Sequence, residues 1–358
     1  MVHYLNRRLL ACVLSLAVCI VPVLAAETSP QQDALRFAGM DTPATDAAHR
    51  TFQSRAGAAW AKYDKQVGRP LAAWARREVA YSGGGEVFYP FSGPDFLTVA
   101  LVYPNAERYV LVAIQDARQP ARPESMGVVQ RQAFEKKLGI AWEKFGRLGF
   151  FRTEDLDDDQ RDLASGIGPS TILMAFAARL GYEVTAVAPL SFNASKGDWE
   201  TLPSDGKWKS VRLSLQKDGR KVTLDYLRLD LSDSGLRAAE PQQAWIGRMA
   251  TKPTLLKAAS HLLQHPSFTV LRDDLVANAP MVVQDETGLD YKELAKIGPV
   301  RLYGNFTQTY HLFKSTTQRA LAAAYKAEKT KGELPFAFSY LKGADARSMQ
   351  IVRRQAKT

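Results

Sequence analysis

Apolar and polar positions follow two different periods along the chain. Short apolar runs bounded by turn residues predict buried β-strands at 86–89, 108–114 and 183–190. Between them, apolar residues recur at helical spacing and predict helices at 94–103, 126–148 and 168–181. Strands and helices that alternate in this way are typical of a parallel sheet covered by helices. We therefore expect an α/β fold with a largely parallel, Rossmann-like sheet.

Residues 208–230 break this rhythm. Apolar and polar residues alternate on both sides of Lys217-Asp218-Gly219-Arg220, which predicts an antiparallel hairpin inserted in the sheet or appended to it. After residue 236 the blocks resume. They predict further helices near 241–250, 254–265 and 309–328, and strands at 280–285 and 300–306.

The N-terminal part of the chain has a different pattern. Residues 27–50 are polar and alanine-rich, which predicts a loose arm that docks through Leu35 and Phe37. Residues 57–80 read as two short helices with a break at Gly68 and Pro70. The simplest division is a signal peptide over 1–25, a helical arm over 26–80 and one α/β domain over 81–358.

The first residues have the organisation of a secretory signal. A basic start with Arg7 and Arg8 is followed by an apolar core over 9–24 and by small residues suited to cleavage. We therefore expect a periplasmic or secreted protein. No later stretch is apolar enough for a transmembrane span, and both cysteines, Cys12 and Cys19, lie in the signal, so the mature chain is expected to contain no thiol.

Net charge narrows the class of partner. The formal charge of +10 falls to +8 when the two arginines of the signal are removed, which favours anionic partners. Nucleic acid does not fit an exported protein with scattered positive residues, so an anionic envelope component or a small polar ligand is expected. The alternative is that the charge serves solubility alone.

The turn Ser92-Gly93-Pro94-Asp95 joins a predicted strand to a predicted helix. Ser92 and Asp95 have the spacing of a capping box, with Pro94 in the first helical turn. Free N–H groups at such a strand end also bind ligands in open parallel sheets, so Ser92 and Gly93 are candidate ligand-binding residues. Ser92 does not fit a nucleophile elbow, because Pro90 and Pro94 stand where that motif requires glycine.

Asp116 ends the next predicted strand, 23 residues after Gly93. This layout resembles a nucleotide-binding Rossmann half, or the cofactor-binding half of an S-adenosylmethionine methyltransferase, and it makes Asp116 a candidate ligand-binding acid. The G-x-G-x-x-G motif is absent, so we expect no cofactor. A degenerate fold of this type used for protein interaction remains an alternative.

Two patterns that suggest a metal fail in detail. His261 and His265 have helical i, i+4 spacing, but no glutamate follows His261 and no third ligand is evident. The acidic run 153–160 lacks the glycine and the final glutamate of a calcium loop. We therefore expect no metal site.

A dispersed polar group offers the main candidate chemistry. Asp285 and Glu286 follow an apolar strand, and they would share an edge of the sheet with Asp95 if the strands are parallel. Lys257 and His261 could complete an acid–base pocket there, with Lys257 as a ligand-binding residue. The alternative is that these are surface turn residues.

The segments SGPDF, KAASHLL and QDETG resemble, in this order, a family of uncharacterised exported bacterial proteins. The resemblance implies export and a shared fold, and no activity. Our leading hypothesis is an envelope ligand-binding or accessory protein. The competing hypotheses are an envelope hydrolase that uses carboxylate and histidine acid–base chemistry, and an interaction protein that docks a partner through Trp60 and Trp74.

Overall fold

The computed structural model of the protein describes residues 29–44, 46–148, 167–310, 313, 316–337 and 347–355. The predicted signal peptide and the acidic run 153–160 lie outside the described residues. Within the described part of the chain, no helix combines the length and apolar character needed to cross a bilayer.

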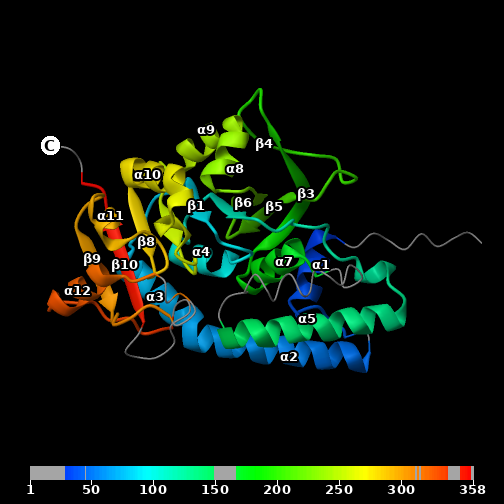
Figure 1. The fold of residues 1–358 in the computed structure, drawn as a ribbon. Coiled ribbons are helices and arrows are strands. Elements are labelled where there is room, and N and C mark those ends of the chain that lie inside the picture. The colour runs from blue at the N-terminus through cyan, green and yellow to red at the C-terminus, as the bar shows by residue number, and fades with distance from the viewer. Residues whose placement is uncertain are drawn as a thin grey trace, which may run out of the picture.

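A ten-stranded sheet runs through the centre of the molecule (Figure 1). Its strands are β1 (Glu86–Pro90), β2 (Arg108–Ala113), β3 (Glu183–Asn193), β4 (Asp198–Thr201), β5 (Ser210–Lys217), β6 (Arg220–Arg228), β7 (Thr254–Leu256), β8 (Met281–Gln284), β9 (Val300–Gly304) and β10 (Ser348–Arg353). Their order is β4-β3-β5-β6-β2-β1-β7-β8-β10-β9. The five strands from β6 to β8 are parallel, and antiparallel strands extend the sheet on both sides. The predicted Rossmann-like α/β fold is confirmed.

The parallel strands have the order of a doubly wound sheet. Counted along the chain, they lie in the order 3-2-1-4-5, from β6 through β2, β1 and β7 to β8. The chain winds outward in one direction from β1 and in the other from β7. Open α/β sheets bind ligands at such a reversal, in the crevice beyond the carboxyl ends of the strands.

Helices cover both faces of the sheet (Figure 1). They are α1 (Pro30–Phe37), α2 (Ala47–Tyr63), α3 (Arg69–Glu78), α4 (Phe96–Val102), α5 (Val128–Leu148), α7 (Pro169–Arg179), α8 (Asp233–Ala238), α9 (Glu240–Met249), α10 (Thr269–Asn278), α11 (Tyr291–Ala295) and α12 (Arg319–Ala327). Helices α1 to α7 contribute to one hydrophobic cluster, and α8 to α11 contribute to another.

The alternation of side chains on β2 shows how the strands divide the core. Tyr109 and Leu111 belong to the first cluster, whereas Val110 and Val112 belong to the second. Successive residues of a strand point to opposite faces of a sheet. Because both faces of such a strand are buried, its residues must be apolar without interruption, and this pattern in the sequence predicted the buried strands.

The N-terminal segment packs against the core through Leu35 and Phe37, as expected, but it is not a loose arm. Residues 30–37 form a helix that begins with a capping box between Ser29 and Gln32, and Phe37 is fully buried. The break expected at Gly68 is a π-helical turn over Asp64–Gly68 that joins α2 directly to α3. Pro70 follows this turn inside a continuous helix, where it lacks the N–H group that an ordinary helical residue would donate.

Trp74 is also buried, which removes it from the docking hypothesis. Its ring lies edge-on to Tyr303 and Phe336, at centroid distances of 5.1 Å and 5.6 Å. The side chain is fully excluded from solvent. Trp74 therefore anchors α3 to the sheet and offers no surface to a partner.

The remaining corrections concern the second half of the chain. The hairpin is confirmed, with Asp218 and Gly219 at positive φ in its turn, but its second strand β6 pairs with β2 and belongs to the parallel part. Residues 254–265 are not a helix. They form β7, an irregular turn and a short 3-10 helix. The final helix begins at Arg319, well after the predicted position.

Candidate functional site

Most of the predicted site residues lie together at the carboxyl ends of β1, β7 and β8, which we call the carboxyl edge of the sheet. Asp95 follows β1, Lys257 and His261 follow β7, and Asp285 and Glu286 follow β8. We call these five residues the edge cluster. All five side chains are buried, so they are not solvated turn residues.

Asp95 and Lys257 form an ion pair at the reversal point between β1 and β7. Lys257 Nζ lies 2.8 Å from Asp95 Oδ2 and 3.0 Å from Thr98 Oγ1. The hydroxyl of Tyr89 donates to the same carboxylate oxygen over 3.0 Å. Burial, followed by the nearby Asp95 charge, raises the pKa of Tyr89 well above its usual range, so Tyr89 remains a donor.

The expected capping box at SGPD was wrong in detail. Asp95 itself is the N-cap of α4, and its Oδ1 accepts from the N–H of Thr98 over 3.2 Å. Ser92 instead donates to the carbonyl of Val112, 3.4 Å away. Gly93 has φ +53°, a conformation that suits glycine. Because the carboxylate of Asp95 already occupies the start of α4, this turn offers no open site for a phosphate.

Asp116 lies apart from these contacts. It follows β2 on the same side of the sheet, but its carboxylate pairs with Arg228 Nε at 2.8 Å, and both side chains are about half exposed. The structure thus pairs the candidate ribose-binding acid with an arginine at the end of β6, and not with a residue of the edge cluster.

Asp285 fixes the backbone that follows β7. Its Oδ2 accepts from the N–H of Ala258 over 2.8 Å, and its Oδ1 accepts from the N–H and the hydroxyl of Thr287. The N–H of Ala259 donates to Thr287 Oγ1 over 2.7 Å. These bonds hold Ala258, Ser260 and His261 at positive φ, which is uncommon outside glycine. Strained backbone of this kind is concentrated at functional sites.

The side chain of His261 is buried, with 4% of its surface exposed. Among the residues that the structure describes, neither ring nitrogen has a partner at hydrogen-bonding geometry. The ring packs edge-on to Phe313, with centroids 5.0 Å apart. Burial lowers the pKa of His261 below 6.5, although the Asp285 carboxylate and the Gln264 side chain oppose this effect, so the imidazole is neutral at pH 7.

Glu286 is fully buried, and only one of its two carboxyl oxygens has a hydrogen-bond partner among the described residues. Its Oε2 accepts from the hydroxyl of Ser348 over 3.1 Å, whereas Oε1 has no partner. Burial, reinforced by Asp285, raises the pKa of Glu286 well above its usual value, which favours the protonated carboxyl group. Gln318 donates to the carbonyl of Glu286 over 2.6 Å, while its own Oε1 has no partner.

The edge cluster contains a single lysine, Lys257, and this side chain is already paired with Asp95. Among the described residues, no three side chains of the types that bind metals gather at one point. The cluster can therefore offer hydrogen bonds to a ligand, and it disfavours an anion.

Sequence reasoning missed several contributors to this site. Thr287 lies in the QDETG segment and could have been included with Asp285. Tyr89 is part of an apolar strand, and Gln318 and Ser348 come from distant segments that carry no motif. The role of Ser348 depends on β10 lying beside β8, which brings its hydroxyl to Glu286.

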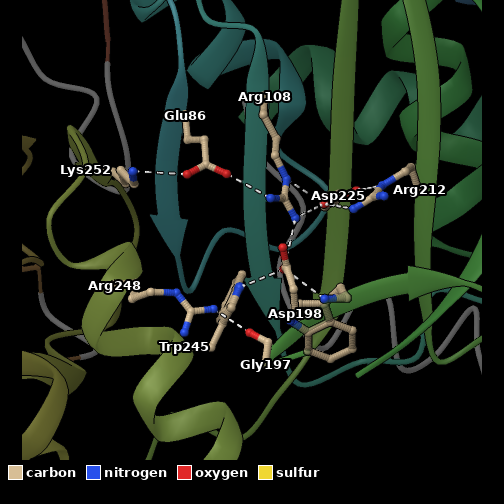
Figure 2. A network of polar contacts seen from close by, with 10 residues as sticks. Glu86, Arg108, Gly197, Asp198, Arg212, Asp225, Trp245, Arg248 and Lys252 are labelled. Carbon is tan, nitrogen blue, oxygen red and sulfur yellow. Dashed lines mark hydrogen bonds and ion pairs between the residues drawn. The ribbon is translucent and has the colours of Figure 1, made fainter. Parts of the chain in front are cut away.

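A second polar cluster lies near the opposite ends of the same strands (Figure 2). We call it the N-terminal network, because it lies near the amino ends of the parallel strands. It contains Glu86, Arg108, Asp198, Arg212, Asp225 and Lys252. The fully buried Asp225 accepts from Arg108 and Arg212 with N–O distances of 2.6–2.9 Å.

The other two carboxylates of the N-terminal network are also paired. Glu86 lies 2.8 Å from Arg108 Nη1 and 3.1 Å from Lys252 Nζ. Asp198 accepts from the indole N–H of Trp245 over 3.1 Å. Burial lowers the pKa of Arg108, but Asp225 and Glu86 outweigh it and raise that pKa above its usual value. The network borders a cavity of about 220 Å³.

Comparisons of the chain with protein-family models, with curated proteins and with solved structures found no match. The function must therefore be argued from the geometry of the edge cluster.

Proposed function

We propose that the protein is exported to the cell envelope and binds a small polar ligand without net negative charge at the edge cluster. Export rests on the signal-like N-terminal sequence. The position of the ligand rests on the reversal of strand order, where doubly wound sheets place their ligands. The basic charge of the chain would serve contact with anionic envelope surfaces outside this site.

The observation that carries the proposal is a group of buried polar atoms that have no partner among the described residues. They are both ring nitrogens of His261, Oε1 of Glu286 and Oε1 of Gln318. Native proteins leave few such atoms without a partner, and each costs about 1–3 kcal/mol. They come from neighbouring segments, because the N–H of His261 donates to the carbonyl of Thr287 and Gln318 donates to that of Glu286. A ligand that satisfies them would recover this cost.

The protonation states define the class of ligand. A neutral imidazole has one donor and one acceptor, a protonated carboxyl has a donor, and an amide oxygen is an acceptor. A ligand with both donors and acceptors matches this set. An anion would lack a free cationic side chain in the cluster, because Lys257 already pairs with Asp95.

A thermal-shift panel tests the proposal. Neutral, cationic and anionic small polar compounds are added to the mature protein and to the His261→Asn variant, since asparagine tolerates the left-handed backbone at this position. We expect a neutral or cationic compound to raise the melting temperature of the wild type and to have a much smaller effect on the variant. A uniform response of both proteins to anions alone would contradict the proposed site, and recovery of the protein from the cytoplasm would contradict export.

A specific observation favours one second candidate, the envelope hydrolase. The pKa of Glu286 is raised and that of His261 is lowered, and such opposite shifts are how acid and base roles are separated in active sites. Chromogenic esters and glycosides test this reading. Hydrolysis by the wild type that is lost in folded His261→Asn and Glu286→Gln variants would support it. Full activity in folded Asp95→Asn and Asp285→Asn variants would exclude these two carboxylates from catalysis.

A further inference from the structure

A groove lined by hydroxyl and amide groups lies between the end of β9 and the start of α12. It encloses a cavity of about 300 Å³. Its polar lining includes Thr307, Gln308, Thr309, Thr316, Thr317 and Gln318. This volume is at the lower end of the range for small-molecule sites.

Gln318 connects this groove to the edge cluster. It is the N-cap residue of α12, it lines the cavity, and its side chain is 3% exposed. Its Nε2 donates to the carbonyl of Glu286, and its Oε1 has no partner. Strands β8 and β9 run in the same direction on either side of β10. Both therefore end on the side of the sheet where the edge cluster lies. Gln318 therefore lines the groove and also contacts Glu286 of the edge cluster, and its Oε1 has no partner among the described residues.

The chemistry of the lining indicates what the groove recognises. Threonine hydroxyls and glutamine amides each supply donors and acceptors without charge. Among the described residues of the lining, Arg319 alone is charged, and its side chain is exposed. Recognition would thus depend on many neutral hydrogen bonds, as a ligand with several hydroxyl groups requires.

A peptide bound as an added strand fits this groove less well. Peptides that extend a sheet need a free strand edge. At the outer strand β9, Gly332 already occupies part of that edge, since it donates to the carbonyl of Leu302 and accepts from the N–H of Gly304. Side-chain hydroxyls and amides then remain as the main source of hydrogen bonds.

We propose that the groove admits a small, neutral, hydroxyl-rich ligand, of the size and chemistry of a simple sugar, and that Gln318 places it against the edge cluster. This inference rests on the proposed function, because it names the ligand class and the entry route of the same site. The threonine hydroxyls bind the outer part of the ligand. The inner part satisfies Oε1 of Gln318 and Oε1 of Glu286.

Titration calorimetry with glucose, N-acetylglucosamine and maltose tests the inference, with glucuronate and glucosamine as charged counterparts. We expect one of the neutral sugars to bind the wild type more tightly than the charged ones. The double variant Thr307→Val/Thr316→Val keeps the shape of the groove and removes two hydroxyls, which should weaken binding about tenfold. Thr201→Val, at an exposed position of β4, is the matched control and should bind like the wild type.

The outcomes separate the two proposals. Sugar binding that His261→Asn weakens but the threonine double variant leaves unchanged would overturn the groove and retain the edge-cluster site. Binding only of a compound without hydroxyl groups, lost in His261→Asn, would overturn the ligand class in the same way. If none of the sugars binds and no compound of the thermal-shift panel depends on His261, both proposals fail.

Discussion

The two polar clusters of this protein lie near opposite ends of the same parallel strands, and they differ in how well their polar groups are satisfied. In the N-terminal network, each carboxylate has hydrogen-bonding or ionic partners, and Asp225 accepts from two arginines (Figure 2). In the edge cluster, His261 and Glu286 retain polar atoms without partners, although both residues are almost fully buried. The carboxylates near the amino ends of the strands are thus paired, whereas some buried polar atoms at the carboxyl ends have no partner among the described residues.

This difference leads us to assign a stabilising role to the N-terminal network and a functional role to the edge cluster. Buried charges that are fully paired hold strands and helices in place, and they leave nothing for a ligand to satisfy. Unpaired buried atoms and left-handed backbone lower stability, and they persist at sites where function requires them. The edge cluster contains both features, which is why we place the function there.

The largest expected effect of a single substitution is in the N-terminal network. Asp225→Ala would leave the guanidinium groups of Arg108 and Arg212 without their shared carboxylate. We expect a loss of about 3–5 kcal/mol in the free energy of unfolding, measured by urea denaturation. Asp198→Ala is the control, and because this side chain is about half exposed its loss should stay below about 1 kcal/mol. Equal losses in both variants would remove the structural role assigned to Asp225.

Removing one partner of the ion pair between Asp95 and Lys257 should destabilise the protein, as removing Asp225 from the N-terminal network should. Lys257→Met leaves the Asp95 carboxylate buried with only Tyr89 and Thr98 as partners. We expect a loss of about 3 kcal/mol. Adding Asp95→Asn to this variant removes the unpaired charge and should restore part of the loss, as a double-mutant cycle would show. A single variant as stable as the wild type would contradict the buried pair.

Glu286 gives a pH test of the comparison. Its pKa is raised in the native state, so above a pH of about 4.5 the unfolded chain releases a proton that the native state keeps. The free energy of unfolding therefore falls as the pH rises from this value toward the native pKa. Glu286→Gln should remove this contribution, so that the variant gains stability relative to the wild type with rising pH. Parallel pH profiles would show that Glu286 is already ionised in the native state.

The smallest expected effect is at Asp116. Its pair with Arg228 is about half exposed on both sides, so Asp116→Asn should change the free energy of unfolding by less than about 1 kcal/mol. Ligand affinity should not change. Loss of binding in this variant would instead favour a nucleotide-type site at the end of β2.

The sequence predicted the sheet better than the turns that follow its strands. The strands β1, β2, β5, β6 and β8 were expected close to their observed positions, because continuous or alternating apolar runs reflect burial directly. Residues 254–265 were expected to be helical, because the spacing of their leucines and histidines is compatible with a helix. Their observed conformation is fixed by side chains of Asp285 and Thr287, which lie 27 and 28 residues further along the chain.

The site was predicted in part for the same reason. Asp95, Asp285 and Glu286 could be placed together because they follow predicted strands and parallel strands end on the same side of a sheet, whereas Lys257 fell within an expected helix. The ion pair between Asp95 and Lys257 could not be foreseen, because it depends on β7 lying beside β1. Local propensity likewise could not reveal that Gln318 lies over Glu286.

The ¹⁵N NMR spectrum of the His261 ring tests the central claim most directly, with the signals assigned by their loss in His261→Asn. The account predicts a neutral imidazole at pH 7 whose two nitrogen shifts change when N-acetylglucosamine or another neutral hydroxylated compound saturates the site. A protonated ring at pH 7, with shifts that none of these compounds alters, would contradict it.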